Sequence, residues 1–262
     1  MILGFIGTGK MGGALASAAA RNAENTILLA NRHPEKAEAL ASETGGEVNS
    51  NSAVAAAADY IFLGVKPRML GEVAGQIREA LKSRSTPFVI VSMLAGTTME
   101  KITGELGFDC PVIRIMPNIP VSAGEGAILY SANSGVTQEE KEAFLSAMKF
   151  SGRFYEIEER LIDAGSAVSG CGPAFAAMFI EALADGGVAC GLPRAAAIEY
   201  AAQMTAGSAK LILDGGISPA ALKDAVCSPG GTTIQGVRAL EEDAFRGAVM
   251  EAVIAAYEKT VE

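Results

Sequence analysis

Short apolar segments alternate with amphipathic ones through the first part of the chain. Because most of the apolar segments lack polar positions, they predict strands that are buried on both faces of a parallel sheet. The predicted strands are Ile2–Ile6, Thr26–Ala30, Glu47–Asn49, Tyr60–Val65, Phe88–Ser92, Val112–Met116, Ala127–Tyr130 and Phe154–Ile157. The predicted helices are Lys10–Asn22, Pro34–Thr44, Ser52–Ala58, Pro67–Lys82, Thr98–Glu105 and Gln138–Phe150. This order predicts an α/β domain over residues 1–158, with a doubly wound, mostly parallel sheet.

The pattern changes after residue 158, where strand signals stop and long alanine-rich helical patterns begin. The predicted helices are Leu161–Ser169, Pro173–Ala189, Arg194–Leu213, Pro219–Val226, Thr233–Glu241 and Ala244–Val261. They predict an all-helical domain over residues 159–262. Several of these helices are apolar on more than one face, and a domain of this size cannot bury so much apolar surface alone. We therefore expect these helices to pack against another subunit.

Composition and charge narrow the classes of ligand. The chain has 262 residues, 50% of them hydrophobic, and a net charge of −9 from 21 Lys and Arg against 30 Asp and Glu. The apolar content excludes a disordered chain. An acidic chain without a basic run is poorly suited to nucleic acid or an anionic membrane, so we expect neither as a partner. An anionic ligand must then be held locally, by helix N-termini, glycine-rich turns or single arginines.

The cysteines and the single histidine argue against a metal site and against histidine-based catalysis. The four cysteines are far apart, and His33 is the only histidine. We therefore expect no metal site, no histidine-based catalytic triad, and reduced thiols in a cytoplasmic protein. No basic segment precedes the first apolar run, so no signal peptide is expected. The uncharged stretch Ala164–Ile180 contains three glycines and Pro173, which favours a buried helix pair over a membrane span.

A glycine pattern after the first predicted strand predicts a dinucleotide site. Residues 7–12 read Gly-Thr-Gly-Lys-Met-Gly, a GxGxxG sequence that follows an apolar strand and opens a helix. In this context Gly7 permits the tight turn, Gly9 lets the backbone approach a pyrophosphate, and Gly12 lets the helix pack against the strand. The pyrophosphate would rest on the helix N-terminus. A packing turn without a cofactor is the alternative, but the context favours a Rossmann-like dinucleotide-binding domain.

The end of the second predicted strand distinguishes NAD from NADP. A carboxylate about 20 residues after the glycines is typical of NAD sites, where it binds the ribose 2′-hydroxyl. Here Asn31 and Arg32 stand in that place. The Arg32 guanidinium can bind a 2′-phosphate, and Asn31 can donate hydrogen bonds to it. We therefore expect NADP as the cofactor, with NADPH preferred over NADH; a solvated Arg32 without a ligand is the alternative.

A second glycine-rich loop separates two predicted helices near the end of the chain. Residues 227–233 read Cys-Ser-Pro-Gly-Gly-Thr-Thr, and a helix follows at once. The pair Gly230 and Gly231 allows backbone angles that turn successive N–H groups toward one anion, and a carboxylate fits such a nest. These residues also fit an ordinary interhelical turn with Thr232 as the N-cap, and this alternative stays open.

The second loop resembles that of a known family. The segment Asp224–Gly236 is similar to the signature of the pyrroline-5-carboxylate reductases, and Ser228–Thr233 is the most specific part of this resemblance. Four further segments resemble the same family, so the resemblance covers essentially the whole chain. They are Gly4–Gly9, Arg114–Pro120, Ser169–Phe175 and Glu181–Val188. One departure is Cys171, where the family usually has serine; we expect this exchange to affect packing only.

The resemblance implies reduction of the cyclic imine 1-pyrroline-5-carboxylate to L-proline with NAD(P)H, the last step of proline biosynthesis. It also implies a homodimer with interleaved helices, often within a larger ring. In this family the loop holds the substrate carboxylate, and the hydroxyl matching Thr233 faces the ring nitrogen, which makes Thr233 the predicted catalytic residue. The predicted substrate-binding residues are Ser228, Gly230, Gly231, Thr232 and Thr233. Together with the glycine pattern and Arg32, the resemblance gives as cofactor-binding residues Ile6, Gly7, Thr8, Gly9, Lys10, Met11, Gly12, Asn31, Arg32, Asn51, Gly64, Val65, Lys66, Pro67, Met93, Leu94 and Ala95.

Three alternative functions stay open. A β-hydroxyacid dehydrogenase has a similar two-domain layout, but its motif places a basic lysine where this chain has Ala176. Oxidation of an alcohol requires such a base, which disfavours this alternative. A non-catalytic NADP sensor would bind the cofactor without consuming it. An imine reductase for another cyclic imino acid is the hardest to separate, because the loop recognises only a carboxylate and a nitrogen.

Overall fold

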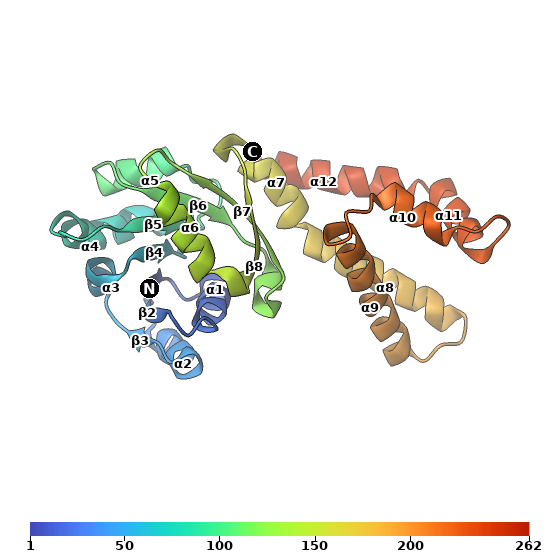
Figure 1. The fold of residues 1–262 in the computed structure, drawn as a ribbon, viewed down its shortest axis with the longest axis horizontal. Coiled ribbons are helices and arrows are strands. Elements are labelled where there is room, and N and C mark those ends of the chain that lie inside the picture. The colour runs from blue at the N-terminus through green and yellow to red at the C-terminus, as the bar shows by residue number, and fades with distance from the viewer. Residues whose placement is uncertain (262) are drawn as a thin grey trace. The chain divides into compact units, whose positions relative to one another are not determined.

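The computed structural model describes residues 1–261, which form two compact units (Figure 1). The first unit contains residues 1–170 and 257–261, and the second unit is Cys171–Ala256. The first unit is built on one eight-stranded sheet, and the second is helical. The predicted fold class, an α/β domain followed by a helical region, is confirmed.

The sheet of the first unit is mostly parallel. The strands are β1 (Ile2–Ile6), β2 (Thr26–Ala30), β3 (Glu47–Val48), β4 (Tyr60–Leu63), β5 (Val89–Ser92), β6 (Val112–Met116), β7 (Gly126–Ala132) and β8 (Gly152–Glu156). Their order is β3-β2-β1-β4-β5-β6-β7-β8, and only β6 and β7 pair antiparallel. The winding direction reverses between β1 and β4, which is where ligands of doubly wound sheets bind.

Helices cover both faces of this sheet (Figure 1). They are α1 (Lys10–Ala20), α2 (Pro34–Thr44), α3 (Asn51–Ala57), α4 (Leu70–Lys82), α5 (Met99–Leu106), α6 (Gln138–Ala147) and α7 (Ile162–Ser169). Residues of α1, α2 and α6 join one core cluster, and residues of α3, α4 and α5 join another. The near-continuous apolar strands therefore bury both of their faces, as their sequences predict.

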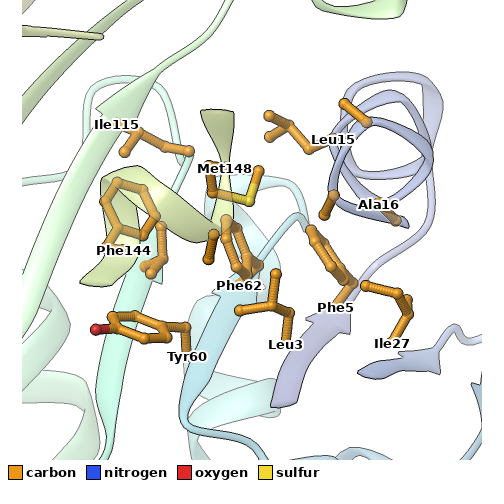
Figure 2. Close-up of a cluster of buried hydrophobic side chains, with 14 of the residues drawn as sticks. Leu3, Phe5, Leu15, Ala16, Ile27, Tyr60, Phe62, Ile115, Phe144 and Met148 are labelled. Carbon is orange, nitrogen blue, oxygen red and sulfur yellow. The ribbon is translucent and has the colours of Figure 1, made fainter. Parts of the chain in front are cut away.

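One of the two core clusters holds β1 and β4 together. Figure 2 shows its aromatic and aliphatic side chains gathered between the strands and the helices. The rings of Phe5 and Phe62, on the adjacent strands β1 and β4, stack with their centroids 4.3 Å apart. Phe144 from α6 and Leu15 from α1 are fully buried in the same cluster. Burial of each such side chain contributes about 1.5–3 kcal/mol, so the cluster fixes the two strands that lead to the switch point.

Local signals fix several helix ends as predicted. The helix α2 has Pro34 at its first position and stops before Gly45, which adopts the left-handed conformation at a φ of 70°. At the start of α6, the Thr137 side chain accepts a hydrogen bond from the Glu140 amide, and the Glu140 carboxylate accepts one from the Thr137 amide. This capping box satisfies two amides that the helix itself leaves unpaired.

One predicted helix is too long. The helix expected over Gln138–Phe150 ends at Ala147, and Lys149–Ser151 forms a short 3-10 turn. The chain must then enter β8 through Gly152, which has a φ of 129°. A Cβ on Gly152 would lie 2.1 Å from the carbonyl oxygen of Gly126, so the close approach of β7 and β8 ends the helix. The other predicted elements differ from the structure by a few residues at their ends.

The second unit exposes most of its large apolar side chains. Its helices are α8 (Gly172–Ala189), α9 (Arg194–Leu213), α10 (Pro219–Val226), α11 (Thr232–Glu242) and the part of α12 (Phe245–Val261) that precedes residue 257. The helix α12 begins one residue later than predicted because Ala244 has a φ of 55°. The buried apolar residues described between Cys171 and Ala256 are all alanines: Ala184, Ala197 and Ala201. The exposed ones include Met178, Leu183, Ile198, Tyr200, Met204, Leu211, Leu240, Val249, Met250 and Ile254. An apolar surface of this kind is typical of a subunit interface.

One helical stretch, Glu159–Ala189, is long and apolar enough by length and composition to cross a membrane. It contains two helices, because α7 ends at Ser169 and α8 starts at Gly172. The predicted helix pair is present, but the prediction that it is buried is wrong for the single chain, where only 11% of the apolar window is buried. A cover from another subunit would account for this exposure.

A buried arginine ties the sheet to the start of α7. Arg114 on β6 is 2% exposed, and its guanidinium lies 3.1 Å from the Asp163 carboxylate and 3.5 Å from that of Glu159. The Glu159 carboxylate also accepts a hydrogen bond from the Met99 amide at the start of α5, at 2.7 Å. Without the arginine, the partly exposed carboxylates of Asp163 and Glu159 would lose the counter-ion that they share.

We expect Arg114→Ala to lower the free energy of unfolding by about 2–3 kcal/mol, less than for a fully buried pair because both carboxylates keep partial contact with water. Urea denaturation at a fixed protein concentration measures this change. The matched control is Arg160→Ala, which removes an exposed ion pair with Glu158 and should cost less than about 0.5 kcal/mol. Equal losses in the two variants would contradict the structural role of Arg114.

Candidate functional site

The carboxyl end of β1 carries a tight turn built on glycine. Gly7 adopts a φ of 98° and donates a hydrogen bond from its amide to the Ala30 carbonyl at 2.8 Å. A Cβ on Gly7 would lie 2.6 Å from the carbonyl oxygen of Gly64, which follows β4. The Gly64 amide in turn donates to the Ile6 carbonyl at 2.8 Å. The ends of β1 and β4 therefore approach so closely that neither glycine has room for a side chain.

The other two glycines of the pattern have opposite surroundings. A Cβ on Gly12 would lie 2.1 Å from the Gly7 carbonyl oxygen, so α1 packs directly against the turn. A Cβ on Gly9 would meet nothing within 4 Å. Gly9 is also the N-cap of α1, and no side chain caps this helix. Open space therefore lies beside the first amides of α1, where an anion can approach the backbone.

A cavity of about 440 Å³ lies at the carboxyl ends of β1, β2 and β4. Many of the predicted cofactor-binding residues line it. They are Ile6, Gly7, Gly9, Asn31, Arg32, Asn51, Gly64, Val65 and Lys66. Residues from four different segments of the sequence are thus brought to one place, at the point where the sheet reverses its winding.

The other predicted cofactor-binding residues do not line this cavity. They are Thr8, Lys10, Met11, Gly12, Pro67, Met93, Leu94 and Ala95. The Thr8 side chain is buried, and its amide lies 3.4 Å from the Asn31 side-chain oxygen. Leu94 is 1% exposed and belongs to the core, so it can reach a ligand only through its backbone. Their participation in binding stays a prediction.

The helical segment after β4 contributes lining residues that the sequence did not single out. Met69, Glu72, Val73 and Gln76 line the cavity. Their spacing of three and four residues places them on one helix face, a signal that the sequence contains. The Gln76 side chain accepts a hydrogen bond from the Asn51 side-chain amide at 2.5 Å. Further lining residues outside the prediction are Ala30, His33, Asn49, Ser50 and Arg68.

Positive charge gathers in the cavity although the chain is acidic. Arg32, Lys66 and Arg68 line it, and Glu72 is the only carboxylate among its lining residues. Within residues 1–261, no hydrogen bond or ion pair engages any of these three cationic side chains. Unpaired cations beside an uncapped helix N-terminus suit a ligand with several negative charges.

The second glycine-rich loop lies in the second unit, between α10 and α11. Gly230 has a φ of 71°, and the Gly231 amide donates to the Ser228 carbonyl at 3.0 Å. A Cβ on Gly231 would meet the Ser228 hydroxyl oxygen at 2.4 Å, so this tight turn depends on glycine. The N-cap of α11 is Gly231, and no side chain caps the helix. The alternative with Thr232 as the N-cap is therefore wrong.

The start of α11 offers the same kind of group as the start of α1. Thr232 and Thr233 occupy its first turn, and both are exposed. The residues that the structure describes provide no hydrogen-bond partner for either hydroxyl. Uncapped amides and two free hydroxyls can together bind a small anion such as a carboxylate.

These features define a class of protein. A glycine turn at the switch point of a doubly wound sheet, open space at an uncapped helix N-terminus and a cationic cavity are the parts of a site for a nicotinamide dinucleotide. The residues fit that cofactor, since no atom fills the space beside Gly9, where a pyrophosphate can approach, and Arg32 can bind a 2′-phosphate. The first unit is therefore that of a dinucleotide-dependent oxidoreductase.

Comparison with known proteins identifies the family. Residues 159–262 match the family described as pyrroline-5-carboxylate reductase dimerisation, and residues 2–96 match NADP oxidoreductase coenzyme F420-dependent. A pyrroline-5-carboxylate reductase of Escherichia coli is 41% identical over 98% of this chain and 96% of its own length. One from Pisum sativum is 36% identical over 99% and 95%. The crystal structure of the Plasmodium falciparum pyrroline carboxylate reductase with NADP bound has a TM-score of 0.85 at 32% identity, covering 99% of this chain and 97% of that one.

The chain belongs to the pyrroline-5-carboxylate reductase family. The resemblance seen in the sequence is thus confirmed over nearly the whole chain. The family match also makes the protein an oxidoreductase with an NADP-binding domain and a helical dimerisation domain.

We expect Gly9→Ala to weaken NADPH binding at least tenfold, because its methyl group would take the space beside the N-terminus of α1. Isothermal calorimetry measures the affinity. The fold should tolerate this change, since no atom lies within 4 Å. In the matched variant Gly12→Ala the added carbon meets the Gly7 carbonyl, which should cost about 1–3 kcal/mol of stability. Unchanged affinity in Gly9→Ala would contradict the assignment of this turn to the cofactor.

Proposed function

We propose that this protein reduces 1-pyrroline-5-carboxylate to L-proline with NADPH, the last step of proline biosynthesis. The observation that carries the proposal is the match to pyrroline-5-carboxylate reductases along 98% of the chain, which includes both glycine-rich segments at once. Similarity to a relative over the dinucleotide domain alone would not identify the substrate. Here the helical part that supplies the second loop matches as well.

The loop before α11 is our proposed substrate site. The Gly230 amide and the first amides of α11 would hold the carboxylate at the uncapped start of this helix, together with the hydroxyls of Ser228 and Thr232. Gly231 would contribute by shaping the turn, since its own amide donates to the Ser228 carbonyl. The hydroxyl of Thr233 would then form a hydrogen bond with the ring nitrogen. This arrangement orients the ring by its carboxylate and its nitrogen and leaves the imine carbon free to react.

The reaction requires little acid or base from the protein. When bound, NADPH supplies a hydride to the imine carbon. A cyclic imine can take up a proton from water before it binds, so the chain need only support the nitrogen as it becomes an amine. The Thr233 hydroxyl can do this, because it has no other partner among the described residues. The main contribution of the protein is position, which can lower a barrier by about 7–11 kcal/mol in well-oriented systems.

We further propose that NADPH is preferred over NADH and that the protein works as a homodimer in the cytoplasm. The preference is supported by Arg32, whose unpaired guanidinium lines the cavity where an NAD site would carry a carboxylate. The homodimer is supported by the exposed apolar side chains of α8, α9 and α12. A functional boundary at residue 158 is supported by the start of the dimerisation match at residue 159.

The assay that tests the substrate follows the absorbance of NADPH after addition of pyrroline-5-carboxylate, with piperideine carboxylate as the comparison. Faster turnover of the larger ring would favour the broader imine reductase. No oxidation of NADPH with either compound would contradict the proposal and favour a cofactor-binding sensor.

Removal of the Thr233 hydroxyl tests its role. We expect Thr233→Ala to lower kcat by roughly ten- to a hundredfold, about 1.4–2.7 kcal/mol of barrier. Thr233→Ser keeps a hydroxyl at the same place and should retain most of the activity. Wild-type turnover in Thr233→Ala would contradict the proposed hydrogen bond.

Reversal of the charge at the end of β2 tests the cofactor preference. We expect Arg32→Asp to raise KM for NADPH at least tenfold and to change KM for NADH much less, because a carboxylate repels a 2′-phosphate but accepts a hydrogen bond from a 2′-hydroxyl. Steady-state kinetics with the two cofactors measures this. An unchanged ratio of the two KM values would overturn the role of Arg32.

A further inference from the structure

Arg68 is a cation of the cavity that neither the glycine pattern nor the family resemblance singles out. It lines the 440 Å³ cavity together with Arg32 and Lys66, and its side chain is exposed. In the described part of the chain no carboxylate forms an ion pair with it, although Glu72 lines the same cavity one helical turn further on. An arginine on an acidic protein that remains unpaired in a cavity is available for an anionic ligand.

The backbone that carries Arg68 is well fixed. Pro67 begins a 3-10 turn, Pro67–Met69, with Lys66 as its N-cap, and the Met69 amide donates to the Lys66 carbonyl at 2.8 Å. The turn leads into α4, whose first residue, Leu70, is buried. Arg68 therefore has a defined starting point and a long side chain that can move toward a ligand.

The sheet order places Arg68 and Arg32 on two sides of the same strand end. Arg32 follows β2 and Arg68 follows β4, and these two strands are the neighbours of β1. Both residues line one cavity, so one bound group can contact both side chains. The pyrophosphate has its own place at the uncapped start of α1, where amides suffice. The 2′-phosphate of NADP is the group that still requires cations.

We propose that Arg68 is a specificity-determining residue that binds the 2′-phosphate of NADP together with Arg32. The inference rests on the proposed use of NADPH. The 2′-phosphate carries up to two negative charges, and a guanidinium can bind two of its oxygens at once. Two arginines can therefore satisfy it together, whereas the ribose hydroxyl of NAD offers no charge to either.

The experiment measures binding of the adenosine part alone, which requires no turnover. Wild type, Arg68→Gln and the control Lys101→Gln are titrated by calorimetry with adenosine 2′,5′-bisphosphate and with adenosine 5′-monophosphate. Lys101 is exposed on α5 and does not line the cavity, so its variant makes the same change in net charge elsewhere. We expect Arg68→Gln to weaken the bisphosphate about tenfold, which is about 1.4 kcal/mol, and the monophosphate less than twofold. The control should change neither.

Two results would overturn the inference. Equal weakening of both nucleotides would mean that Arg68 acts on the adenine or the 5′-phosphate, and unchanged affinities would mean that it does not bind the cofactor. In either case the reduction of pyrroline-5-carboxylate by wild type with NADPH would show that the proposed function stands without Arg68. If wild type itself binds the bisphosphate no better than the monophosphate, the proposed NADPH preference fails together with the inference.

Discussion

The close approach of two strand ends determines where everything else in the first unit can lie. Gly7 and Gly64 pass each other with no room for a Cβ on either, and Gly12 brings α1 against the same turn. The stacked rings of Phe5 and Phe62 hold β1 and β4 together on the core side of this contact. As a result α1 points its uncapped N-terminus at the carboxyl edge of the sheet, and Arg32, Lys66 and Arg68 meet in one cavity. Side chains at these glycines would separate the strands and remove the cavity.

The two proposed sites suit anions although the protein as a whole is acidic. Its net charge is −9, yet each proposed site has an uncapped helix N-terminus that follows a glycine turn, α1 after Gly9 and α11 after Gly231. Such a site acts through backbone amides and the helix dipole, and the electrostatic effect of the dipole is limited to about the first turn of the helix. Of the two sites, the cavity beside α1 adds the cations Arg32, Lys66 and Arg68, and there we place the 2′-phosphate. This division explains how a dinucleotide and a small imino acid can be recognised separately by one acidic chain.

Much of this arrangement could be predicted from the sequence, and the reasons for success and failure are physical. The bounds of α9 and α10 are as predicted, because proline and the Ser218 side chain mark their starts. The predicted end of α6 was wrong, because the helix stops where Gly152 must approach Gly126. This contact joins distant parts of the chain and leaves no local signal. The same limit applies to Arg68 and Gln76, whose membership of the cavity depends on how β4 and α4 fold beside β1. The exposed apolar faces of the second unit were anticipated from helical patterns that are apolar on more than one face. The burial expected for Ala164–Ile180 is absent from the single chain, because burial depends on contacts that no local pattern specifies.

The central claim is that a hydride passes directly from NADPH to the imine carbon of a small acid. NADPH that carries deuterium at C4 of the nicotinamide, on one face and then on the other, tests this most directly when the proline product is analysed by mass spectrometry and NMR. The account predicts that one of the two labelled cofactors gives proline with a single deuterium, and that the other gives none. The deuterium should lie on the ring carbon that is bonded to the nitrogen and does not carry the carboxylate. Proline without deuterium from both cofactors, or oxidation of NADPH without formation of proline, would contradict it.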